Sequence, residues 1–397
     1  MGLFFGTVFG IYFIINAYMF ARLFMTLAGC GAVRAIACVA FLLFAASFPA
    51  GRLLAHRMPA PAADVLILMG SLYLSPMIYG FLLSVAADAF GLLNSVVAIT
   101  HNPPPFSPGV RMCSVFAIFA ASIAITLAGA WNANTPVVVA IDIPAETDPA
   151  AAPSDVTTKI ALLSDIHLGR LTGPKYLKKL VEKTNAQDPD IILLLGDTID
   201  DESFFRDAER MSAAAEALSS FKSRLGAWAV LGNHDYYAGD AQVSDFLSRA
   251  GVTLLRDEAA VVSGELILIG RDDRSASLRG FERKSIEEIA ASSPPLQSDA
   301  PTLPTIVMDH QPFGLEEAES AGATLQVSGH THRGQLFPVN FIVAFMYEKH
   351  YGLYKRGKTN YYITSGAGVW GPPVRTAGRP EIVMLNLGHS AKEVGER

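Results

Sequence analysis

The first third of the chain consists of long apolar segments separated by short connectors. Four of these segments approach or exceed the ~20 residues that a membrane-crossing helix needs. They cover residues 2–20, 33–50, 65–87 and 112–130. The first has no basic segment before it and is too long for the apolar part of a cleaved signal peptide, so it predicts a retained helix. The pattern predicts an anchor of about four transmembrane helices within residues 1–133, and residues 90–100 either extend the third helix or lie at the interface.

After the anchor, a segment rich in Ala, Pro and Asp predicts a linker at 134–158. Strand patterns at 159–164, 190–195 and 227–231 then alternate with helical spacing at 174–186 and 204–221. This order predicts an α/β domain over 159–390, with a largely parallel sheet flanked by helices. Further elements are expected as strands at 266–269, 305–308, 324–327, 361–364 and 382–387, a loop at 292–304 and a tail at 391–397.

Composition divides the chain in the same way. Hydrophobic residues make up 51% of it and charged residues only 17%, and nearly all the charges follow Asp142. The formal net charge of -6 argues against nucleic acid as a partner, because nucleic acid binding calls for a basic stripe. Cys30, Cys38 and Cys113 all lie in the apolar part, so the α/β domain has neither disulfides nor cysteine-bound metal.

The basic residues between the apolar runs bear on orientation. With the N-terminus outside, the inner connectors hold Arg22, Arg34 and Arg111, and the outer one holds Arg52 and Arg57. The positive-inside rule then favours an extracytoplasmic α/β domain by a single charge.

The acidic residues of the apolar part decide between anchoring and transport. Only Asp64 and Asp88 lie in or beside the runs, and along a helix they are a full bilayer apart. A transport path requires intramembrane ionisable residues, so we interpret the helices as an anchor.

Five predicted strands end in a polar signature. These are Ser164-Asp165-Ile166-His167, Gly196-Asp197-Thr198-Ile199-Asp200, Gly232-Asn233-His234-Asp235, Asp309-His310-Gln311-Pro312 and Gly329-His330-Thr331-His332. The carboxyl ends of strands face the ligand crevice of α/β sheets, and alternation along an extended strand would point both ligands of a D-x-H or H-x-H pair the same way. Carboxylates, an amide and imidazoles are the mixed ligand set of two divalent cations. One such signature is more typical of a loop, but five in this order favour a metal site.

These motifs resemble those of the calcineurin-like metallophosphoesterases over about residues 159–387. The resemblance implies a two-sheet sandwich with helices outside and a centre of two divalent ions, Mn, Fe or Zn. It implies that Asp165, His167 and His332 hold one ion and Asn233, His310 and His330 the other, with Asp197 as the bridge. His234 is then the general acid or phosphate-binding group, and Asp200 orients its imidazole.

The chain departs from the family pattern after Asp200. Members that act on phosphoserine or phosphothreonine have Arg-Gly there, whereas this chain has Asp201 and Glu202, which disfavours phosphoproteins as substrates. Segments 329–335 and 365–375 look closer to transmembrane members, which are similar to hydrolases of UDP-diacylglucosamine in lipid A synthesis. That likeness implies a lipid-linked phosphodiester or pyrophosphate substrate, a bacterial-type inner membrane and, for this substrate, a cytoplasmic domain.

An apolar run follows the H-x-H motif at 337–347, and cationic residues follow the run. Phe341, Phe345 and Arg356 are therefore candidate contacts to a lipid substrate and its headgroup, with membrane lipid as the partner. The alternative is that the run packs on the sandwich. Two other functions remain open, a broad-specificity phosphodiesterase on non-lipid substrates and a non-catalytic metal-binding sensor. No obligate protein partner is expected.

Overall fold

The computed structural model describes residues 2–97, 107–143, 157–292 and 303–388. These residues form two compact units, one within 1–131 together with Gly371–Val374 and one made of Asn132–Trp370 and the residues from Arg375 onward. Most of the expected loop at 292–304 and the whole expected tail at 391–397 lie outside the described residues.

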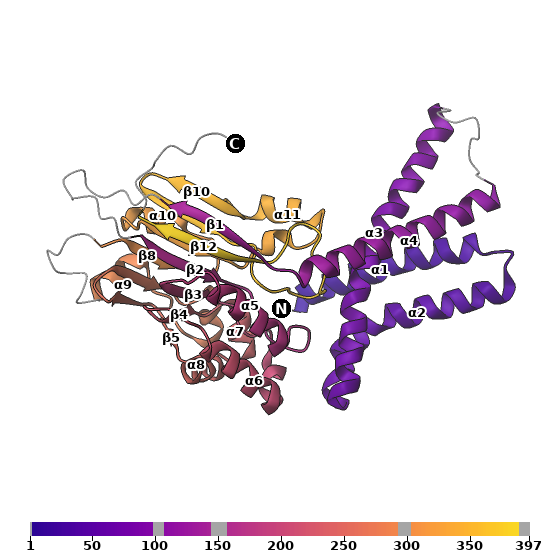
Figure 1. The fold of residues 1–397 in the computed structure, drawn as a ribbon. Helices are drawn as coiled ribbons and strands as arrows, with labels where there is room; N and C mark the ends of the chain where they lie inside the picture. Colours follow the sequence, from indigo (N-terminus) through magenta and orange to yellow (C-terminus); the bar gives the residue numbers. More distant parts are fainter. Residues whose placement is uncertain (1, 98–106, 144–156, 293–302, 389–397) are drawn as a thin grey trace. The chain divides into compact units, whose positions relative to one another are not determined.

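The helical unit confirms the prediction of four membrane-length helices (Figure 1). Its helices are α1 (Gly2–Thr26), α2 (Gly31–Leu54), α3 (Ala60–Val97) and α4 (Pro108–Ala133), with a 3-10 turn η1 (Ala55–Arg57) after α2. Each is long and apolar enough to cross a bilayer. Helix α3 continues through Val97, so the described part of the 90–100 segment extends the third helix.

Asp88, on α3, has partners within this unit. It forms an ion pair with Arg22 of α1 and accepts a hydrogen bond from the Tyr18 hydroxyl at 2.5 Å. Acidic groups in membrane helices are expected to pair in this way. The pair gives Asp88 a structural role, which favours anchoring over transport.

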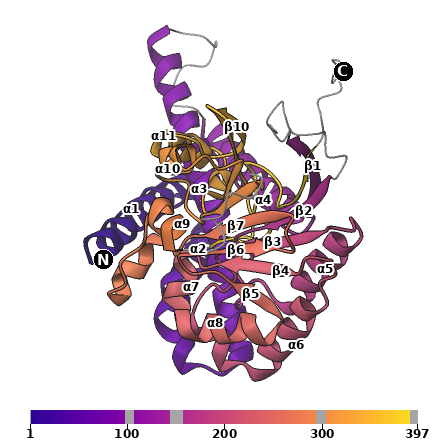
Figure 2. The ribbon, with the colours of Figure 1, turned by 90° about the vertical axis from the view of Figure 1, so that its left-hand side faces the viewer.

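The second unit contains two six-stranded mixed sheets (Figures 1 and 2). The first runs β1 (Val137–Ile143), β12 (Glu381–Leu387), β2 (Thr158–Leu163), β3 (Ile191–Leu195), β4 (Ala227–Val230), β5 (Val252–Leu254). The second runs β10 (Gly352–Arg356), β11 (Thr359–Ile363), β9 (Leu325–Ser328), β8 (Thr305–Met308), β7 (Leu266–Gly270), β6 (Glu258–Val262). Strands β2 to β5 are parallel to one another, as are β7, β8, β9 and β11. All eight expected strands are present.

Strands such as β3 and β7 are buried along their whole length, so both of their faces are covered, which explains why they are continuously apolar. In β2, Ile160 and Leu162 face the core between the sheets, while Ala161 and Leu163 belong to the core under the helices of the first sheet. Those helices include α5 (Pro174–Asn185), α6 (Ala208–Ser219) and α8 (Asp240–Arg249). Helices α9 (Ile286–Ser292) and α10 (Leu315–Ser320) pack on the second sheet. The expected sandwich with outer helices is confirmed.

Two segments differ from the expectation. Strand β1 lies inside the segment assigned to a linker; it pairs with β12 in parallel, and its Ile143 enters the core between the sheets. The strand is short, and the Ala, Pro and Asp residues near it are typical of a linker, so its Val and Ile residues were not recognised as a strand. The helix expected at 204–221 is divided into η2 (Glu202–Arg206) and α6, because the Asp207 carboxylate accepts a hydrogen bond from the Arg210 backbone and caps a new helix.

Candidate metal centre

The polar signatures meet at the carboxyl ends of β2, β3, β4, β8 and β9. Their side chains form groups whose ligand atoms all lie within 4.8 Å of one another. The groups are Asp165, His167 and His332; Asp197, His310 and His330; and His167, Asp197 and His234. The first group equals one ion set implied by the family resemblance. The second holds two members of the other set together with Asp197. Asn233 begins the short helix α7 (Asn233–Ala238), which follows β4.

The backbone at these positions is unusual. Asp165, His167, Asp197, His330 and His332 all have positive φ angles, between 48° and 68°. Residues other than glycine rarely adopt this conformation, which costs on the order of 1 kcal/mol or more at each position. The two ligand pairs, Asp165 with His167 and His330 with His332, therefore lie in tight turns after β2 and β9. The expectation that alternation along an extended strand points both members of a pair the same way is wrong. Strain at so many adjoining positions is typical of a functional site.

Two glycines of the signatures allow close approach. A Cβ on Gly232 would lie 2.2 Å from the Asp197 Oδ1 atom, and one on Gly329 would lie 2.5 Å from an Asp165 carboxylate oxygen. Neither position has room for a side chain. The glycines therefore let β4 and β9 bring their ligands against the two carboxylates.

Asp197 lies between the two groups. Its Oδ2 atom is 3.7 Å from the His167 Nε2 atom and 3.2 Å from the His310 Nε2 atom, while its Oδ1 atom accepts a hydrogen bond from the His234 backbone. Burial opposes its ionisation, but His310, His234 and His167 hold the pKa of its carboxyl well below the usual range. A buried, ionised carboxylate shared by two imidazole groups is placed as a bridging ligand requires.

Contacts of the Nδ1 atoms orient two of the imidazoles, those of His310 and His167. The His310 Nδ1 atom donates to the Leu195 carbonyl at 2.7 Å, and the His167 Nδ1 atom faces the Asp200 carboxylate at 3.1 Å. The Nε2 atoms of His167 and His332 then face each other at 3.1 Å. Outer partners of this kind orient metal-binding histidines.

One buried atom supports a fit to cations directly. The Asn233 Oδ1 atom is buried without a hydrogen-bond partner among the described residues. Buried polar atoms are normally satisfied, so this atom calls for a ligand. Burial and the neighbouring His310 lower the pKa of His330, and burial and the neighbouring His167 lower the pKa of His332, so both are neutral as metal binding requires. The donors match two divalent ions.

His234 lies beside these groups with a different environment. Its Nδ1 atom donates to the Asp200 carbonyl at 2.8 Å and lies 3.2 Å from the Asp200 carboxylate. Burial works against protonation, but Asp197 and Asp200 raise the pKa of His234 to about 9. The ring is therefore an imidazolium at neutral pH. Asp200 was predicted to orient His234, and its carboxylate contacts His167 as well.

Arg375 is a further residue of this site, one that no sequence motif indicated as functional. It is fully buried, its Nε and Nη2 atoms donate to the Gly368 carbonyl at 3.0 and 2.7 Å, and Nη2 also contacts the His332 Nδ1 atom at 3.1 Å. A buried guanidinium against a metal-ligand candidate is a positioning group. Its only sequence signal was its place at the end of the family-like segment 365–375.

The three candidate lipid contacts lie in the segment that follows His330 and His332 along the chain. Helix α11 (Val339–Met346) has no buried residue, and the side chains of Phe341 and Phe345 are 55% and 92% exposed. The described contacts of Arg356 are ion pairs with Glu319 at 2.7 Å and Glu348 at 3.7 Å. Helix α11 thus leaves a large apolar surface uncovered, and Arg356 is already neutralised.

Residues 158–334 match the model of the calcineurin-like phosphoesterase family. An "Uncharacterized metallophosphoesterase" of Aquifex aeolicus is 32% identical over 237 residues, which cover 59% of this chain and 87% of the relative. The chain therefore belongs to the calcineurin-like phosphoesterase family, whose fold carries a centre for two divalent metals. Its four candidate spans make it a membrane-associated member.

Other similar proteins share a smaller part of their length with this chain. A "Transmembrane protein with metallophosphoesterase domain" of Danio rerio is 33% identical over 265 residues, which cover 64% of this chain and 58% of that protein. The chain spans about three fifths of the length of this and two bacterial relatives. Among solved structures, a 5'-nucleotidase precursor from Thermus thermophilus aligns with a TM-score of 0.36 at 17% identity, over 58% of this chain and 55% of that one.

Proposed function

We propose that this protein is a dinuclear metal-dependent hydrolase that cleaves a phosphodiester or pyrophosphate bond of a lipid-linked substrate, such as UDP-diacylglucosamine. The observation that carries the hydrolase is the pair of buried ligand groups that meet at Asp197, with the protonated His234 beside them. The lipid substrate is supported by the exposed apolar helix α11 and by the membrane helices.

Asp165, His167 and His332 would hold one ion, and Asn233, His310 and His330 the other, with Asp197 between them. Two divalent ions, when bound, neutralise phosphate charge and acidify water. The chain itself supplies the proton for the leaving oxygen. The Nδ1 atom of His234 is hydrogen-bonded to the Asp200 carbonyl. The Nε2 atom of the imidazolium is therefore the one that donates the proton to the leaving oxygen.

Phe341 and Phe345 form what we call the apolar lip, two exposed rings on α11, the helix that follows the H-x-H motif. Exposed aromatic surface of this kind is suited to acyl chains or to the boundary of a bilayer. Since Arg356 is paired with Glu319 and Glu348, the lipid proposal rests on the two phenylalanines. A nucleotide-linked lipid substrate would place the domain at the cytoplasmic face of a bacterial-type inner membrane.

Turnover of a substrate panel with added Mn tests the hydrolase. The panel holds a bis-aryl phosphodiester, an aryl monophosphate and UDP-diacylglucosamine, and we expect the lipid to react with the highest kcat/KM. Asp197→Ala is the matched inactive control because it removes the carboxylate between the two groups. Absence of hydrolysis in the native protein and the control alike would refute the hydrolase and favour a metal-binding sensor.

A Phe341→Ser/Phe345→Ser variant tests the lip. We expect the ratio of kcat/KM for the lipid to kcat/KM for the soluble diester to fall about tenfold or more, because two exposed rings lose their contact with lipid. The control is Leu278→Ser, which changes an exposed apolar residue that is 60% accessible on a different element, η3 (Arg274–Arg279). An unchanged ratio in the double variant would exclude the lip from substrate binding.

A further inference from the structure

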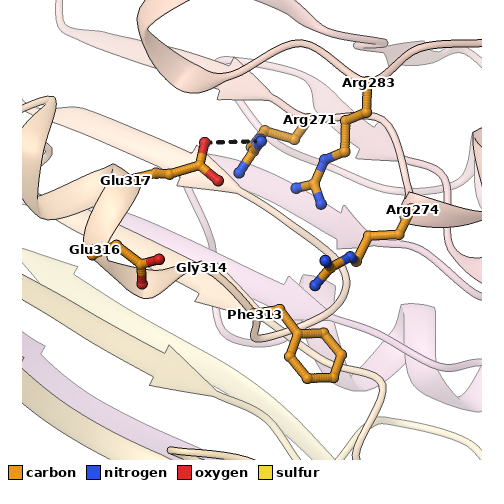
Figure 3. Close-up of a pocket in the computed structure, with 7 residues that line it drawn as sticks. All are labelled: Arg271, Arg274, Arg283, Phe313, Gly314, Glu316 and Glu317. Carbon is orange, nitrogen blue, oxygen red and sulfur yellow. Dashed lines mark ion pairs between the residues drawn. The ribbon is translucent and has the colours of Figure 1, made fainter.

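A cavity of about 480 Å³ opens beside the loop that carries His310 (Figure 3). Its size is within the range of small-molecule sites. The lining residues are Arg271, Arg274, Arg283, Phe313, Gly314, Glu316 and Glu317. The three guanidinium groups gather on one side and the two glutamates lie on the other.

The arginines have more donors than the protein satisfies. Arg271 and Arg283 share the buried carboxylate of Asp309, and Arg271 also pairs with Glu317 at 3.0 Å. Even so, the Nε atoms of both arginines are buried without a hydrogen-bond partner among the described residues. For Arg274 the described contact is with an aromatic ring, since its guanidinium lies 4.9 Å from the ring centre of Phe313. Buried, unsatisfied donors on two arginines of one cavity favour an anionic acceptor.

The cavity adjoins the candidate metal centre through two links. Asp309, which holds Arg271 and Arg283, directly precedes the ligand candidate His310 in the chain. Phe313 packs on Tyr347 with ring centres 4.9 Å apart, and Tyr347 lies 6.1 Å from the His330 ring. An aromatic pair therefore separates the arginines from the metal ligands. A group bound in the cavity would be near the reacting bond without occupying its place.

We propose that this cavity binds a second phosphate group, the non-scissile phosphate of a substrate whose reacting bond lies at the metal centre. This inference rests on the proposed hydrolase function. Arginine is suited to the task because its planar fork makes two parallel, charge-assisted hydrogen bonds to phosphate oxygens. The Glu317 side chain is 38% exposed, whereas its Oε2 atom, which pairs with Arg271, is buried, so an entering phosphate would have to displace this carboxylate. The cavity then selects pyrophosphate diesters over simple phosphodiesters.

Arg274→Gln is the informative variant. Removing Arg283 would leave the buried Asp309 beside Arg271 alone, whereas no ion pair is recorded for Arg274 among the described residues. In the Mn-loaded full chain, we expect the KM of a diaryl pyrophosphate, divided by the KM of a bis-aryl phosphodiester, to rise about 10-fold or more, as expected for a lost charge-assisted hydrogen bond. Arg274→Lys should recover part of the loss.

Arg249→Gln is the matched control, because this guanidinium is 73% exposed and pairs with Asp245 on α8. It should leave the KM ratio unchanged. A second arm titrates the Mn-loaded protein with inorganic phosphate by calorimetry, where Arg274→Gln should remove one class of sites. Loss of that class with an unchanged KM ratio would identify free phosphate as the occupant and overturn the substrate assignment.

The two proposals fail in different ways. If the native protein hydrolyses no compound, the hydrolase is refuted, and the calorimetric comparison still decides whether the cavity takes phosphate. If the native protein turns over both substrates while Arg274→Gln changes neither the KM ratio nor phosphate binding, the cavity is not a phosphate site.

Discussion

Asp200 is the residue whose replacement tests the proton-handling part of the site most directly. Its carboxylate lies 3.1 Å from the Nδ1 atom of His167 and 3.2 Å from that of His234. Asp200→Asn keeps the shape and removes the charge. Because the Asp200 carbonyl still accepts a hydrogen bond from the His234 Nδ1 atom at 2.8 Å, the ring should stay in place.

The size of the expected change in the pKa of His234 follows from the loss of one negative charge beside its imidazolium. An adjacent opposite charge changes a pKa by about 1 to 3. The Asp200 side chain is 27% exposed, so solvent screens it and the lower half of this range applies. The pKa of His234, about 9 in the native protein, should therefore fall. Because the general acid must be protonated, the alkaline limb of the kcat profile should move about one to two pH units toward acid.

The assay is kcat against pH for a bis-aryl phosphodiester at saturating Mn. Saturation matters because Asp200 also orients His167, so the variant should bind Mn about 10- to 100-fold more weakly. The control is Asp201→Asn, which changes the neighbouring carboxylate that caps η2 through the Ser203 backbone. An alkaline limb that stays in place in Asp200→Asn, or moves toward base, would refute the assignment of Asp200 and His234.

Three further predictions concern the same centre. His234→Ala should lower kcat about 10²- to 10⁴-fold without changing the Mn content measured by elemental analysis, and a variant that keeps full activity would remove the acid role. Asp197, followed by Asp165, raises the pKa of His310 well above its usual value against the effect of burial, so that His310 is protonated in metal-free protein at pH 7. Mn binding should then release protons and strengthen as pH rises toward that pKa, and calorimetric heats independent of the buffer would contradict this. Arg375→Lys removes the guanidinium that contacts both the Gly368 carbonyl and the His332 Nδ1 atom, and it should weaken Mn binding about 10- to 100-fold. The exposed Arg249→Lys is the control and should leave Mn binding unchanged.

Local sequence patterns were enough to predict the elements and the candidate ligands. Apolar length predicted four membrane helices, and strand periodicity predicted β2, β3 and β4 to within about two residues at each end. Signatures such as Gly232-Asn233-His234 were visible because each directly follows a strand. These features are local, so a short window of sequence contains them.

Tertiary structure decided which of these residues meet and what surrounds them. Asp165 accepts hydrogen bonds from the backbone of His330, a residue 165 positions away, and Arg375 contacts His332 from an irregular segment with no recognisable spacing to it. Strand β1 could be assigned only through its pairing with β12 near the other end of the chain. The arginine cavity needs the ends of β7 and β8 side by side. Such contacts depend on how the sheets pack, because burial and pairing between distant segments leave no periodic pattern in the sequence.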